Sequence, residues 1–131
     1  MGAVNWFAVV LGTVAFFAVG AVWYGVLFTS RWQREVGVKD PPQGSMVAKV
    51  MGLTLLCEFL VVSTLGHLLA RTQPTAHVKM MMAMGFAVTI MAPAIGINYI
   101  HQRRSLTLFL IDAGHFLVGM AAAGAVFIWL T

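Results

Sequence analysis

Hydrophobic residues fall into four long runs along the chain, and none of the runs shows the alternating pattern of a half-buried strand. The runs extend over residues 5–28, 47–69, 78–100 and 106–130. Each is longer than the ~20 residues that an α-helix needs to cross ~30 Å of hydrocarbon. Within lipid, backbone polar groups need partners inside the same segment, which a helix provides. The pattern predicts four transmembrane helices in a single domain, residues 1–131.

The connections between the runs are polar, and only the first is long. It covers residues 29–45 and contains Pro41, Pro42 and Gly44, which indicate a loop, while the preceding stretch "SRWQREVG" is typical of a short interfacial helix. Short connections make consecutive helices antiparallel neighbours. We therefore expect an all-α fold, a polytopic four-helix antiparallel bundle.

The composition makes the membrane assignment firm. Hydrophobic residues account for 60% of the chain and charged residues for 9%, whereas a soluble domain has about 25% charged residues. A water-soluble protein of this size would need many more charges to cover its surface. The single cysteine, Cys57, has no partner for an internal disulfide.

Basic residues are unevenly distributed over the connections. The first and third connections with their edges contain six: Arg31, Arg34, Lys39, Lys49, Arg103 and Arg104. The second contains only Arg71 and Lys79. Since cytoplasmic loops are enriched in Lys and Arg, both termini are predicted to lie outside. The net charge of +4 then reflects topology and attraction to anionic lipid head groups, and we predict no nucleic-acid partner.

The first hydrophobic run could also suggest a signal peptide. However, no basic residue precedes it, and at about 24 residues it is longer than the apolar region of a signal peptide. We expect it to remain as a mature helix.

Three ionisable residues lie at membrane depth, namely Glu58 in the second run and Asp112 and His115 in the fourth. Both runs start on the predicted inner side. At 1.5 Å per residue, Asp112 lies ~9 Å, His115 ~13 Å and Glu58 ~16 Å from the start of its helix. A charge at such a depth costs at least ~2.5–3.5 kcal/mol. We therefore expect all three side chains to share one slab and to face the bundle interior.

The fourth run places its polar pair on a face made of small residues. Asp112 and His115 are three positions apart, and the same face continues through Gly119, Ala122 and Ala123. Small residues allow membrane helices to approach closely. This face is predicted to be the packing surface of the helix.

The first interpretation of the polar slab is structural. Asp112 would form hydrogen bonds with polar side chains near the inner helix ends, namely His115, Tyr24 or Asn98. Glu58 would bond to Thr54, one turn away. In this interpretation the polar residues only hold the helices together.

The second interpretation is transport. Glu58, Asp112 and His115 would form a relay for protons or cations, and Pro93 with Gly96 would break the third helix to free backbone carbonyls. Four helices enclose little space for a pathway, so this interpretation includes a homo-oligomer.

The third interpretation is a haem or metal site. In a two-fold dimer, His115 and the two carboxylates would give a ligand set similar to that of di-iron bundles. We nevertheless predict no cofactor. The sequence contains no P-loop, HExxH or CxxC motif, and we predict that the protein is not an enzyme.

Several stretches taken in order resemble a bacterial membrane family known as domain of unknown function 1761. They are "NWFAV", "WYGVLF" followed by "RW", "GHLLA", "NYI" and "LTLFLIDAGHFLV". The resemblance implies a small, multi-pass, four-helix protein of the bacterial inner membrane, without an assigned substrate, cofactor or catalytic residue. It also implies that an aromatic residue is common at the position of His115 and that Asn alternates with the acid at position 112, which weakens an obligatory role for His115.

The leading functional hypothesis from the sequence is an oligomeric channel or transporter-like protein for protons, cations or a small solute. The alternative is a structural or accessory subunit of a larger membrane complex.

Overall fold

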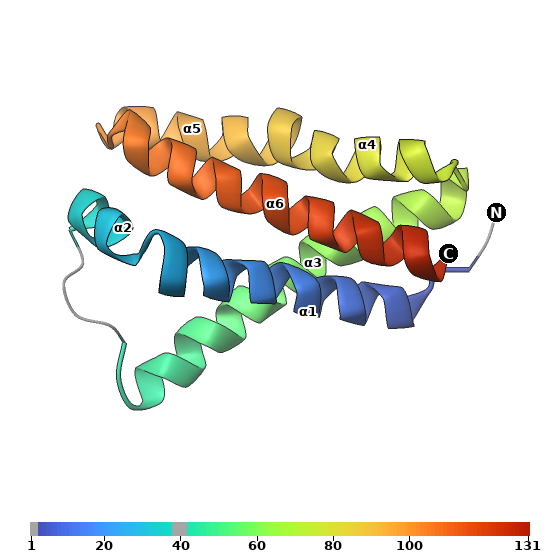
Figure 1. The fold of residues 1–131 in the computed structure, drawn as a ribbon, viewed down its shortest axis with the longest axis horizontal. Helices are drawn as coiled ribbons and strands as arrows, with labels where there is room; N and C mark the ends of the chain where they lie inside the picture. Colours follow the sequence, from blue (N-terminus) through green and yellow to red (C-terminus); the bar gives the residue numbers. More distant parts are fainter. Residues whose placement is uncertain (1–2, 38–41) are drawn as a thin grey trace.

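The computed structural model describes residues 3–37 and 42–131, and it is helical throughout with short connections (Figure 1). Two helices each contain a π-helical segment. The elements are α1 Trp6–Val22, a π-helical segment Trp23–Leu27, α2 Thr29–Val36, α3 Ser45–Thr72, α4 Ala76–Phe86, a second π-helical segment Ala87–Met91, α5 Ala92–His101 and α6 Leu106–Leu130. Lys39 and Pro41, which entered the sequence argument, lie outside the described residues.

The four predicted transmembrane helices are confirmed. The described residues contain four helices long and apolar enough to cross a membrane: Trp6–Leu27, Ser45–Thr72, Ala76–His101 and Leu106–Leu130. The second and third helices begin two residues before the predicted apolar runs. Helical backbone hydrogen bonding includes the two residues that precede each run. The short helix expected in the first connection is α2. The N-out and C-out orientation stays a prediction.

Helix α6 occupies the middle of the fold, with α1 on one side and α4 and α5 on the other (Figure 1). Its first turn is capped by Ser105, whose Oγ accepts a hydrogen bond from the backbone N–H of Leu108 at 3.1 Å. The largest fully buried side chains join α1, α3 and α6, and they include Phe16, Leu65 and Phe127. The core is therefore built around α6.

The small-residue face of α6 does receive α1. Gly119 lies so close to Phe16 that a Cβ there would be 2.7 Å from its ring. One turn further, Ala123 is fully buried opposite Gly12. Ala122, on the edge of this face, is half-buried. The packing surface predicted from the sequence is thus the α1–α6 interface.

Helix α3 crosses α1 obliquely and is packed into the bundle only over its C-terminal half (Figure 1). Close approach occurs at Gly66, where a Cβ would lie 2.8 Å from Val9. Over residues 45–57 every side chain is exposed except the half-buried Thr54. The first fully packed residue of α3 is Glu58.

The third transmembrane helix is not broken at its proline. Pro93 lies at the start of α5, directly after the π-helical segment Ala87–Met91. There the N–H of Ala92 bonds to the carbonyl of Ala87, five residues back, so the widened turn accommodates a residue that lacks an N–H. The helix is continuous through this point, contrary to the expected break.

Candidate functional site

The carboxyl group of Asp112 holds three helices together near the α2 end of the bundle. The hydroxyl of Tyr24 donates a hydrogen bond to Oδ1, and the hydroxyl of Tyr99 donates to Oδ2. Tyr24 lies in the π-helical segment after α1, Tyr99 in α5 and Asp112 in α6. These are the only two tyrosines of the sequence. We call this arrangement the tyrosine–aspartate clamp.

A tryptophan beside the clamp fixes the same helix pair. The indole Nε1 of Trp23 donates to the backbone oxygen of Ile111 at 2.8 Å. Its ring lies over Gly114, where a Cβ would be 2.9 Å from Trp23 Cζ2. Consecutive residues of the "WYG" stretch thus bind the backbone and the side chain of adjacent positions on α6.

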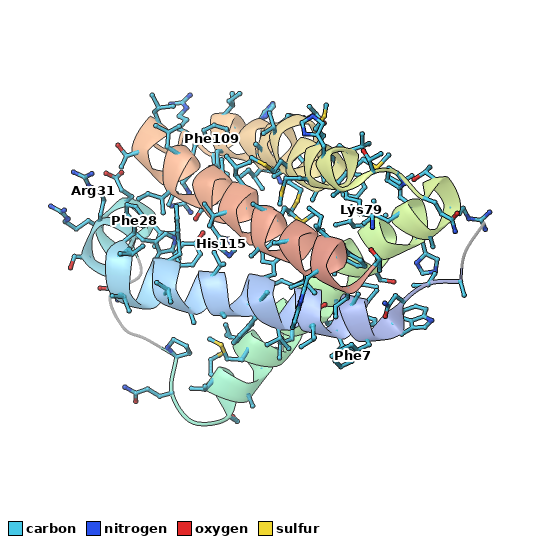
Figure 2. The ribbon with its side chains drawn as sticks, turned by 45° about the vertical axis from the view of Figure 1, so that its right-hand side comes forward. Phe7, Phe28, Arg31, Lys79, Phe109 and His115 are labelled. Carbon is cyan, nitrogen blue, oxygen red and sulfur yellow. The ribbon has the colours of Figure 1, made fainter. Side chains whose placement is uncertain are left out.

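His115 lies between α1 and α6, as Figure 2 shows, in a cage of aromatic rings. Its ring centroid lies 5.0 Å from that of Tyr24, 5.1 Å from that of Phe116 and 5.5 Å from that of Phe16. Neither ring nitrogen has a hydrogen-bond partner among the described residues. A Cβ at Gly20 would lie 3.0 Å from Nε2. The bond to the neighbouring aspartate considered from the sequence is not formed.

Glu58 has a buried carboxyl oxygen that lacks a hydrogen-bond partner in the described structure. The residue is 7% exposed, and its Oε2 atom has no hydrogen-bond partner among the described residues. Thr54, the partner expected from the sequence, instead donates its hydroxyl to the carbonyl of Val50 at 2.7 Å. Glu58 shares a face with Val62 and Gly66, which pack on α1. It therefore lies where α3 leaves the bundle.

The three residues of the predicted slab lie on two helices. Asp112 and His115 lie on the inner face of α6, and Glu58 lies on α3. No hydrogen bond joins any two of the three in the described part of the chain. Nor do residues 3–37 and 42–131 contain a group of three or more His, Cys, Asp or Glu side chains that could hold a metal ion. The metal-site hypothesis requires a two-fold dimer and stays a hypothesis.

Of the three partners considered for Asp112 from the sequence, Tyr24 is confirmed, whereas His115 and Asn98 form no hydrogen bond with it in the described part of the chain. Asn98 is exposed, and the adjacent Tyr99 takes the position beside Asp112. The signal that was overlooked is that the only other tyrosine, Tyr24, lies at the same end of its helix.

Comparison of the chain with curated proteins and with solved structures finds no match. Comparison with protein families finds one described as protein of unknown function, DUF1761, which matches residues 7–128. The match covers all four transmembrane helices almost completely, including the clamp residues and Glu58. The chain belongs to this DUF1761 family.

Proposed function

We propose that the protein is a small oligomeric membrane channel or transporter that passes protons or small cations, and that Glu58 is the group that binds them. The observation that carries the proposal is the buried, unpartnered Oε2 atom of Glu58. An acidic side chain inside a membrane normally faces a partner or a pathway.

The energetics of Glu58 favour a ligand from outside the described chain. A buried polar atom without a hydrogen bond costs ~1–3 kcal/mol, and more when it is charged. A bound proton removes the charge, and a bound cation offsets it. Either ligand would be held more tightly at Glu58 than at a carboxyl group that is already satisfied.

Asp112 is the weaker candidate for ion exchange. Both of its oxygens accept hydrogen bonds from tyrosine hydroxyls, so a cation would have to displace one of them. His115 adds no relay step in this structure, because no hydrogen bond connects it to Asp112 or to Glu58 within the described residues.

The position of Glu58 also supports access from one side of the membrane. It is the first fully packed residue after the exposed half of α3, residues 45–57. In the proposed homo-oligomer, a second copy covers this half of α3 and completes the pathway that ends at Glu58. A single chain presents only one wall of such a pathway.

A structural or accessory role in a larger membrane complex is the competing proposal, and the clamp favours it. The clamp uses both tyrosines and Asp112, one of the two carboxyl groups that are buried among the described residues, to join helices. Interhelical hydrogen bonds of this kind are a common means of packing in membranes. In this alternative, Glu58 meets a side chain of another subunit.

Proton flux into liposomes that contain the purified protein and a trapped pH-sensitive dye tests the proposal. We expect flux driven by a potassium diffusion potential, and we expect Glu58→Gln to abolish it. Asp112→Asn is the matched control, since its amide can still accept from one tyrosine and donate to the other. It should retain flux per folded protein.

Helical content by circular dichroism and a single peak in gel filtration establish that each variant is folded. Wild-type flux that persists unchanged in Glu58→Gln would overturn the assignment of Glu58. Absence of proton and cation flux in the wild-type protein would overturn the transport proposal and leave the accessory role.

A further inference from the structure

Helix α2 is fixed against the turn between α5 and α6 (Figure 1). Arg104 donates from Nη1 to the backbone oxygen of Val36 at 3.2 Å, at the C-terminal end of α2. Ser105 donates from Oγ to Oε2 of Glu35 at 2.5 Å. These bonds hold an eight-residue helix in one orientation at the end of the bundle.

The apolar side of α2 faces the bundle. The ring of Trp32 packs edge-on against Tyr24 at a centroid distance of 5.6 Å. Tyr24 belongs to the clamp, so α2 is connected to the packed interior through one aromatic contact. Tryptophan and tyrosine favour the depth at which lipid head groups meet hydrocarbon, which places α2 at that level.

Three arginine side chains around this helix are free to meet a ligand. Arg31 and Arg34 lie three positions apart on α2, Arg103 lies in the α5–α6 turn, and all three are exposed. None has a side-chain hydrogen bond or ion pair among the described residues. The one acidic residue of α2, Glu35, is occupied by Ser105. In Figure 2 the Arg31 side chain extends away from the bundle.

Strongly exposed apolar side chains lie within a few residues of the same arginines along the chain. Ile100 is 75% exposed and Leu106 70% exposed, one on each side of the α5–α6 turn. Val26, just before α2, is 74% exposed. A ligand that fits both surfaces carries a negatively charged group at one end and hydrocarbon at the other.

We infer that α2 and the α5–α6 turn bind the phosphate head group of an anionic phospholipid, through Arg31, Arg34 and Arg103. Guanidinium groups match phosphate oxygens in two-point hydrogen bonds. The acyl chains lie along Ile100 and Leu106. Basic sites between helices at a membrane surface recognise lipid head groups in this way. The inference does not depend on the proposed function of Glu58.

Native mass spectrometry of the full chain, purified in mild detergent with equal amounts of phosphatidylglycerol and phosphatidylcholine, tests the inference. We expect phosphatidylglycerol to remain bound preferentially to the wild-type protein. Each arginine removed should weaken this retention about fivefold. The variant is Arg34→Gln, and the matched control is Lys49→Gln.

Lys49 belongs to the N-terminal part of α3, which lies apart from α2 in Figure 1. It is on the same predicted side of the membrane, so both variants lose one charge from the same surface. Equal loss of retention in both variants would overturn the inference, because it would indicate a diffuse surface potential. Equal retention of the two lipids by the wild-type protein would overturn it as well. Inorganic phosphate that displaces the lipid at millimolar concentration would assign the arginines to a soluble phosphate instead.

Discussion

Removal of the tyrosine hydroxyls should show that the clamp is a cooperative unit. Tyr24→Phe and Tyr99→Phe each delete one hydrogen bond to Asp112 and keep the ring. Interhelical hydrogen bonds in membrane proteins contribute ~0.6 kcal/mol on average and up to ~1.7 kcal/mol. The free energy of unfolding of each single variant should therefore fall by ~0.6–1.7 kcal/mol, because the remaining tyrosine hydroxyl still donates a hydrogen bond to the carboxyl group.

The double variant should lose more free energy of unfolding than the two single variants lose together. Without either hydroxyl, Asp112 becomes a buried carboxyl group with no donor, which costs ~1–3 kcal/mol in addition. Coupling energies of ~0.5–3 kcal/mol are typical of residues in one hydrogen-bond network. The double-mutant cycle should give a coupling energy in that range.

Unfolding in mixed micelles with increasing sodium dodecyl sulfate, followed by far-ultraviolet circular dichroism, measures these free energies. Thr64→Val is the matched control. Its exposed hydroxyl donates to the carbonyl of Leu60 within the same helix at 2.9 Å, so its loss should change stability by less than ~0.5 kcal/mol. The reasoning would be refuted if the free energies of unfolding of the single variants lay within ~0.3 kcal/mol of the wild-type value. It would also be refuted if the loss in the double variant equalled the sum of the two single losses.

Three further changes probe the packing around α6. Gly119→Ala should cost ~1–3 kcal/mol through overpacking against Phe16, whereas Gly85→Ala, with open space at its Cβ, should leave the thermal unfolding midpoint unchanged or raise it. Replacing His115 by Phe keeps the ring in its aromatic cage and removes two unpartnered nitrogens; stability in the same detergent titration should be equal or higher, and a loss above ~1 kcal/mol would reveal an unseen partner. Ser105→Ala removes the cap of α6 and should cost ~1 kcal/mol, with the loss visible as faster amide exchange in the first turn of α6.

The boundaries of the transmembrane helices followed closely from the sequence. For the last helix the predicted range and the observed range are both 106–130. Hydrophobic length is decisive in a membrane, because only a helix satisfies every backbone group within the lipid. The preceding Ser105 then sets the start, since its side chain accepts a hydrogen bond from the free N–H of Leu108 in the first turn.

The partners of Asp112 could not be read from the sequence with the same accuracy. Successive residues of a helix point 100° apart, so whether Asn98 or Tyr99 faces α6 depends on the rotation of α5. The π-helical segment Ala87–Met91 changes that rotation, because it inserts a wider turn before the proline. Such a segment has no clear signature in the hydrophobic pattern.

The sequence by itself determined that the chain forms four helices long and apolar enough to cross a membrane, and that Glu58 lies within the second of them. Only the tertiary structure decided that Oε2 of Glu58 remains without a hydrogen-bond partner among the described residues. That outcome depends on the oblique crossing of α3, which is set by close contacts at Gly12 and Gly66. Hydrophobic periodicity reports how deep a residue lies and which face it occupies. The angle between two helices is decided by the shapes of side chains that meet from distant parts of the chain.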